Sequence, residues 1–334
     1  MPDDIMQLNE LPGRGAGMRR VPEKGETRMR KRRILSLILF ISVLLTALPS
    51  LAEGLPVYFQ RDDYYKPEFV QWVDESPFDC PEEDLLQIDF VGIRQGDCII
   101  ISYKGKRMLV DGGENFRFMA VEKYMIQQGI TRFDYFFLTH AHDDHIGLPA
   151  RLLNHGYIPD VQYSPYDDTE KYSSWTPYVK QLKSAGVEMV KVSGGDTVTI
   201  MDGVTLQFWQ WPQTEADTMN DHSAVAMVCF REARMLLTGD ICGNAQRWLA
   251  ENYPPEVFKC DIMKSPHHGN TVMVQEFLTG ADPTMMVITN PRSATKGVNN
   301  QLDKLGIAHV DITYTLHCQT DGKVWYLWRE EMPK

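Results

Sequence analysis

The chain has 334 residues, of which 43% are hydrophobic and 24% charged, a balance typical of folded proteins that excludes a largely disordered chain. The formal net charge is −11. Because affinity for phosphate backbones comes from Lys and Arg, this acidic balance argues against nucleic acid as a partner. It favours a small-molecule substrate or a cell-surface polymer.

Residues 1–52 are predicted to be an N-terminal extension with a signal peptide or a membrane anchor. The basic run 28–33 is followed by the apolar stretch 34–48 and by small residues up to Ala52, which is the pattern of a cleaved secretory signal. An uncleaved anchor is the alternative, because a membrane span needs only ~20 apolar residues. We therefore expect a secreted protein or one on the extracellular face of the membrane, with membrane contact only through this segment.

Residues 53–84 are a lead-in segment without clear periodicity, and 85–330 are predicted to form one domain. Short apolar runs there are separated by Gly, Lys and Asp, which indicates strands joined by turns. Two strand-rich halves with helices predict two packed sheets flanked by helices. Strands are expected at 85–93, 97–103, 107–113, 133–140, 187–192, 196–201, 204–211, 223–230, 234–240, 259–265, 284–290, 308–314 and 323–328, and helices at 115–129, from Ile146, and at 174–186, 243–252 and 271–280.

Six cysteines lie beyond the predicted cleavage site, where an oxidising compartment would permit disulfides. The sequence does not choose among the possible pairings. Cys98 and Cys229 lie inside apolar runs, so we expect these two to be buried free thiols. No Cys spacing typical of a structural zinc site is present.

The run THAHDDH (139–145) directly follows an apolar strand and precedes a helix. His140 and His142 are two residues apart, so they point to the same side of an extended segment. A tighter turn can direct Asp144 and His145 toward a second point. Imidazole nitrogens and carboxylate oxygens are ligands that zinc accepts. A polar loop rich in histidine by chance is the alternative, but three of the nine histidines fall within six positions, which favours a metal site.

The hexapeptide HAHDDH (140–145) resembles the HxHxDH signature of the metallo-β-lactamase superfamily. Residues 95–113, 220–240 and 260–270 are similar, in order and spacing, to motifs of its ComEC-type metallo-hydrolase branch. The resemblance covers residues 85–328. It implies a four-layer αββα fold with two packed mixed sheets, and two divalent metal ions, expected to be zinc with manganese or iron as alternatives.

The resemblance implies a ligand set for two ions. His140 and His142 would hold the first ion, Asp144 and His145 the second, and Asp240 of the LLTGD motif would bridge both. Asp144 is also expected to take part in catalysis. The apolar residues before Asp240 predict a strand that fixes its position.

Five further residues are assigned by the same resemblance. His268 is expected to complete the second site, while His267 would face the substrate and act in catalysis by hydrogen bonding or proton donation; the reverse assignment is the alternative. His222 is expected to ligate the first ion, or else to be a surface-loop histidine. Asp97 and Asp111 are expected to orient the ligating histidines.

The expected activity is hydrolysis of phosphodiester or phosphoester bonds by a metal-bound hydroxide. A β-lactam, lactone or thioester hydrolase is the first alternative, and a non-catalytic binding protein of the same fold is the second. The sequence departs from the branch in two places. The GIRQGD loop is longer by two residues, and a GHP histidine often found before the last helix is missing.

Overall fold

The computed structural model describes residues 69–78, 84–212, 214 and 218–331, all within a unit that spans Tyr58–Lys334. The predicted extension, signal or anchor at 1–52 and much of the lead-in segment lie outside the described residues, as does Cys80. None of the described helices combines the length and the apolar character that crossing a bilayer requires.

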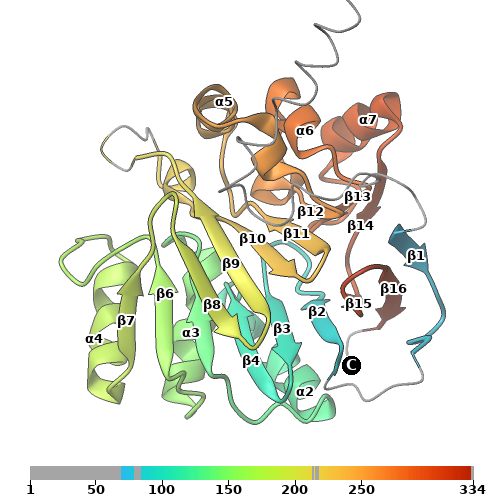
Figure 1. The fold of residues 1–334 in the computed structure, drawn as a ribbon. Helices are drawn as coiled ribbons and strands as arrows, with labels where there is room; N and C mark the ends of the chain where they lie inside the picture. The colour runs from blue at the N-terminus through green and yellow to red at the C-terminus, as the bar shows by residue number, and fades with distance from the viewer. Residues whose placement is uncertain (1–68, 79–83, 213, 215–217, 332–334) are drawn as a thin grey trace, which may run out of the picture. The chain divides into compact units, whose positions relative to one another are not determined.

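Two β-sheets pack against each other (Figure 1). Neighbouring strands of the first sheet are antiparallel from β16 to β4 and parallel from β4 to β7. The nine strands of this sheet are, in spatial order, β1 (Val70–Trp72), β16 (Trp325–Glu330), β15 (Thr315–Thr320), β2 (Leu86–Phe90), β3 (Ile99–Tyr103), β4 (Lys106–Val110), β5 (Tyr135–Phe137), β6 (Val161–Ser164) and β7 (Glu188–Lys191).

The second sheet is also mixed. It is antiparallel from β8 to β11 and parallel from β11 to β14, so both sheets contain a parallel half. Its seven strands are, in spatial order, β14 (Ala308–Asp311), β13 (Met285–Ile288), β12 (Ile262–Lys264), β11 (Ala233–Leu237), β10 (Val225–Phe230), β9 (Val204–Trp209) and β8 (Thr197–Met201).

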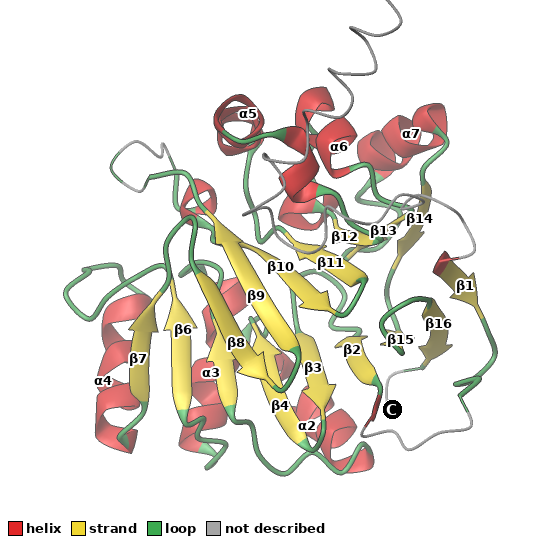
Figure 2. Ribbon diagram, viewed as in Figure 1, coloured by secondary structure: helices red, strands yellow, loops and turns green. Residues whose placement is uncertain are grey.

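Alternating strand residues face two different apolar cores. In β3, Ile99 and Ile101 face the other sheet, whereas Ile100 faces the helices, as the two-residue period of a strand requires. The outer face of the first sheet is covered by α2 (Phe118–Gln127), α3 (Asp143–Asn154) and α4 (Trp175–Ala185), and that of the second by α5 (Gly243–Asn252), α6 (Gln275–Ala281) and α7 (Lys296–Leu305) (Figure 2). The predicted four-layer αββα fold is confirmed.

The chain does not divide cleanly into one sheet per half. The β15–β16 hairpin, from the end of the chain, joins the first sheet beside β2. The sequence does not predict β1, β6 or β15 as strands. In β15 the reason is composition, because the buried strand contains the polar residues His317 and Gln319, and His317 Nδ1 lies 2.8 Å from an oxygen of Asp89.

The described cysteines are free thiols. Cys98 is buried, as expected, but Cys229 is only half-buried, because its position on β10 lies at the margin of the core between the second sheet and its helices. The other free thiols are Cys242, Cys260 and Cys318.

Candidate metal centre

Most of the predicted ligands, and the supporting Asp111, lie where parallel strands of both sheets end. Asp111 follows β4, and His140 and His142 follow the parallel neighbour β5. In the other sheet, Asp240 follows β11, and His268 follows the parallel neighbour β12. In α/β folds, ligands bind beyond the carboxyl ends of parallel strands, which is the edge that these residues occupy.

The HAHDDH motif spans the junction between β5 and α3. The helix begins at Asp143, three residues before the expected start at Ile146, with His142 as its extended N-cap. Asp143 and Asp144 therefore occupy the first helical turn, where carboxylates are stabilised by the helix dipole and by free backbone N–H groups. Asp144 and His145 consequently project from a helix, and not from an irregular turn.

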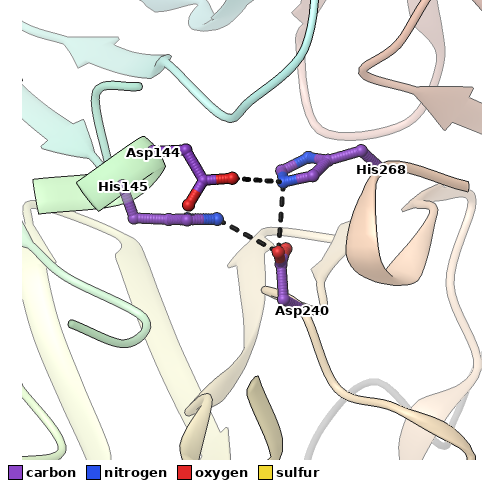
Figure 3. A group of neighbouring side chains, drawn as sticks. All are labelled: Asp144, His145, Asp240 and His268. Carbon is purple, nitrogen blue, oxygen red and sulfur yellow. Dashed lines mark ion pairs between the residues drawn. The ribbon is translucent and has the colours of Figure 1, made fainter. Parts of the chain in front are cut away.

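Four of the predicted ligands converge on one point (Figure 3). Asp240 Oδ2 lies 3.2 Å from His145 Nε2 and 3.1 Å from His268 Nε2. Asp144 Oδ2 lies 3.8 Å from the same nitrogen of His268. His145, His268 and Asp240 are buried, whereas the Asp144 side chain is 30% exposed, so the cluster opens to solvent on the side of Asp144.

Asp111 orients the ring of His145. Its two oxygens accept hydrogen bonds from the Thr139 backbone N–H (2.8 Å) and from the Thr139 hydroxyl (2.7 Å). His145 Nδ1 lies 2.8 Å from Asp111 Oδ2. Because an ionised carboxylate only accepts hydrogen bonds, His145 Nδ1 carries a proton, and Nε2 is the nitrogen that faces Asp240 and can bind a cation.

A second chain of hydrogen bonds orients His268. The Thr289 hydroxyl donates to Asp97 Oδ1 at 2.7 Å and therefore accepts from His268 Nδ1 at 3.0 Å. Asp97 Oδ1 is also 3.3 Å from that nitrogen. His268 thus presents the lone pair of Nε2 to the same Asp240 oxygen that His145 faces.

This arrangement fits a bound cation. Both Nε2 atoms are buried and neither makes a hydrogen bond, although each lies close to a carboxylate. Buried lone pairs beside a buried carboxylate are costly unless a positive charge lies between them. The four residues offer two imidazole nitrogens and two carboxylate oxygens, all within 4.8 Å of one another, a donor set that suits zinc, manganese or iron.

Charges within the cluster stabilise one another. Burial alone would lower the pKa of His145, but the carboxylates of Asp240 and Asp111 raise this pKa well above the ordinary value. Burial alone would raise the pKa of Asp240, but His268 and His145 hold it well below its usual range. Asp240 is therefore ionised, and the cluster binds protons where no other cation is bound.

His140 and His142 form a pair next to this cluster. Nε2 of His140 lies 3.0 Å from Nδ1 of His142, so the two rings direct nitrogens toward a shared point, as their spacing predicts. The His140 and His145 ring centres are 4.1 Å apart, which places the pair beside the second group of ligands. For His140, burial dominates and lowers the pKa well below its usual value, so the ring is neutral.

His222 lies apart from the converging cluster. It is buried in the 3₁₀ turn Asn220–His222, its Nδ1 makes no hydrogen bond, and its ring centre is 5.7 Å from that of Tyr172 and 6.2 Å from that of Tyr166. Within the described residues, the groups of three or more possible ligand atoms lying within 4.8 Å do not include it. Its assignment to the first ion stays a prediction.

The pair His267-His268 lies in the 3₁₀ turn Pro266–Gly269, and both residues have a left-handed backbone, with φ of 49° and 53°. Left-handed conformations are costly for residues other than glycine and concentrate at functional sites. The turn separates the two rings: His268 joins the cluster, whereas His267 is half-buried with Nδ1 3.8 Å from the Cys242 sulfur. His267 is thus partly open to solvent, with its ring centre 6.1 Å from that of His268.

Three residues that the sequence did not single out support the cluster. Thr139 and Thr289 make the hydrogen bonds described above. Lys264 is fully buried, with its ammonium nitrogen 2.6 Å from Asp97 Oδ2 and 3.3 Å from Asp240 Oδ1. The sequence could have indicated this role of Lys264 only through its place at the end of a buried apolar strand. Lysine is rare there without a partner.

Gly239 allows the Asp240 turn to pack against the histidine motif. Its φ is 51°, and a Cβ there would lie 2.8 Å from Ser223 Cβ and 3.0 Å from Thr139 Cβ. We expect Gly239→Ala to lower the free energy of unfolding by about 2–4 kcal/mol, since overpacking adds to backbone strain. Urea denaturation measures this change. Gly203→Ala is the control, because Gly203 also has positive φ but no atom within 4 Å of its Cβ position; equal losses would contradict the packing argument.

Comparisons with known proteins match the part of the chain that contains this site. Residues 91–284, which contain every predicted ligand, match the family described as "Metallo-beta-lactamase superfamily". The chain is 25% identical over 224 residues to ComE operon protein 3 of Bacillus subtilis, in a match that covers 61% of this chain and 28% of that protein. It is 44% identical over 62 residues to Ribonuclease Z of Nanoarchaeum equitans, covering 18% of this chain and 19% of that protein.

Among solved structures, the metallo-beta-lactamase fold protein YhfI from Bacillus subtilis has a TM-score of 0.46 and 14% identity, covering 73% of this chain and 99% of that one. The match to ComE operon protein 3 covers less than a third of the length of that protein. The family match extends over more than half of the chain and includes the HAHDDH motif. The predicted family is confirmed: this chain belongs to the metallo-β-lactamase superfamily.

Proposed function

We propose that the protein is a two-metal hydrolase of phosphodiester or phosphoester bonds that acts in a secreted or surface-attached form. The observation that carries the proposal is the convergence of two buried imidazole nitrogens on one oxygen of Asp240, with Asp144 at the open side. These nitrogens, Nε2 of His145 and Nε2 of His268, make no hydrogen bond, so the cluster is suited to holding a cation.

Each predicted ligand has a place in this proposal. His140 and His142, together with His222, would hold the first ion. Asp144, His145 and His268 would hold the second. Asp240 lies next to both groups and would contact both ions. Two bound ions, expected to be zinc with manganese or iron as alternatives, would polarise a phosphoryl oxygen and lower the pKa of water at the site.

Asp144 and His267 are the proposed catalytic side chains. Asp144 is the partly exposed member of the cluster, so its carboxylate can accept a proton from an attacking water molecule. Burial lowers the pKa of His267, which makes its imidazole neutral at pH 7. A neutral imidazole N–H in this half-buried position can donate a hydrogen bond to an anionic substrate oxygen.

The bond type is supported by similarity to a protein named Ribonuclease Z, since ribonucleases cleave phosphodiester bonds. The acidic net charge favours a small or cell-surface substrate over nucleic acid. Secretion or surface attachment is proposed from the basic and apolar pattern at residues 28–52.

Hydrolysis of bis(p-nitrophenyl) phosphate and p-nitrophenyl phosphorylcholine by the metal-loaded protein tests the proposal. We expect turnover of at least one of them, reduced about 10²-fold or more in His142→Ala, because a first-ion ligand is lost. His155→Ala is the matched control, since His155 is exposed and packs on Phe118. Turnover of nitrocefin alone would instead indicate a β-lactam hydrolase, and inactivity on every substrate would favour a binding protein.

A further inference from the structure

Lys264 is the last residue of β12, and its ammonium group is enclosed by acceptors. The side chain is fully buried. Nζ lies 2.6 Å from Asp97 Oδ2, 2.7 Å from the Gly239 carbonyl oxygen and 3.3 Å from Asp240 Oδ1. An ammonium group has three N–H donors, and three acceptors surround this one. Lys264 therefore acts in the structure as a fixed cation.

The two oxygens of Asp240 have different partners as a result. Oδ1 faces Lys264, whereas Oδ2 lies 3.2 Å from His145 Nε2 and 3.1 Å from His268 Nε2. A carboxylate free to rotate could offer both oxygens to metal ions. The contact to Lys264 restricts that rotation and directs a single oxygen to the ligand cluster.

Lys264 also connects Asp240 to the residues that orient His268. Asp97 receives Lys264 on Oδ2 and the Thr289 hydroxyl on Oδ1, and Thr289 in turn accepts from His268. The Lys264 ammonium group thus links Asp240, which would contact both ions, to Asp97, which supports His268. The GIRQGD loop, which carries Asp97, reaches the cluster through this contact.

We propose that Lys264 is a positioning residue: by holding Asp240 Oδ1, it keeps Oδ2 facing the ligand cluster that would hold the metal ions. The inference rests on the proposed two-metal site. Removing the ammonium group would release Asp240 and leave it beside Asp97 with two unbalanced buried negative charges. Loss of charge balance and loss of position are separate effects, and they call for separate variants.

The test compares Lys264→Met with the double variant Lys264→Met/Asp97→Asn. The double variant removes both buried charges and keeps an acceptor oxygen for Thr289. Asp97→Asn alone measures the cost of losing the Asp97 charge beside His268, so a further loss in the double variant reports the contact to Asp240. Zinc affinity is measured by competition with a chromophoric chelator, and ligand geometry by the visible absorption of the cobalt(II)-loaded protein. Lys304→Met, the same substitution at an exposed position of α7, is the matched control.

We expect both variants to bind zinc about 10- to 100-fold more weakly than the wild type, the usual effect of removing a group that supports a metal ligand. We also expect their cobalt spectra to differ from that of the wild type, while Lys304→Met leaves both measurements unchanged. A double variant with the affinity and spectrum of Asp97→Asn alone would overturn the inference and restrict Lys264 to neutralising Asp97.

The same measurements separate this inference from the proposed function. Wild-type protein that binds zinc tightly but cleaves no phosphodiester would refute the proposed reaction, while the affinities of the two variants would still decide the role of Lys264. Wild-type protein that retains less than one zinc ion per chain would refute both.

Discussion

Asp240→Asn is expected to lower kcat/KM for bis(p-nitrophenyl) phosphate by about 10³-fold or more. The substitution removes the negative charge on which His145 Nε2 and His268 Nε2 converge. Metal ions contribute several kcal/mol to such reactions, and each 1.36 kcal/mol corresponds to about tenfold in rate. We expect bound metal, measured by mass spectrometry of the purified variant, to fall from two ions per chain to one or none.

The control for this variant is Asp143→Asn, the same change one residue before Asp144. Asp143 is exposed and accepts a hydrogen bond from Ser174, so it does not belong to the ligand cluster. The Asp143→Asn protein should retain two ions and nearly full activity. An Asp240→Asn protein that keeps two ions and more than about a tenth of wild-type activity would contradict the assigned role, since a lost ligand costs well over tenfold.

The affinity for zinc is expected to fall by about 10- to 100-fold for each unit by which the pH is lowered below neutrality. Carboxylates around His145 and His268 raise the pKa of both rings in the metal-free protein, against the effect of burial. A metal ion must displace these protons, one or two per ion, and proton competition strengthens as the pH falls. The dependence should vanish above the raised pKa of His145.

Zinc titrations by calorimetry in two buffers with different ionisation enthalpies count the protons released. Asp111→Asn provides the comparison, because Asp111 is one of the groups that raise the pKa of His145. With a lower pKa on this ring, the pH dependence should begin at lower pH and be shallower near neutrality. An affinity that does not change with pH would show that the histidines of the cluster do not bind the ion.

The local motifs could be read from the sequence because each depends on neighbouring residues. The extended segment after β5 places His140 and His142 on the same side, and nitrogens of the two rings lie 3.0 Å apart. The same holds for the apolar run before Asp240, which forms β11. The helix Gly243–Asn252 has its predicted bounds, since its pattern is complete within one segment.

Other features depended on contacts between distant segments. The choice between His267 and His268 follows from a left-handed turn, which the sequence shows only as a glycine at position 269. Likewise, the polar strand β15 is stable inside a sheet because β2 and β16 satisfy its backbone on both sides. Apolar patterning could not reveal it.

The amino-acid sequence by itself determined which residues could bind metal, because ligand identity and spacing are local properties. Only the tertiary structure decided how those ligands are oriented. Thr289 and Asp97 are 192 positions apart, and Lys264 and Asp240 are 24 apart, yet each pair is in contact. These contacts arise where strand ends from two sheets meet, and the register of those strands is set by core packing across the whole domain.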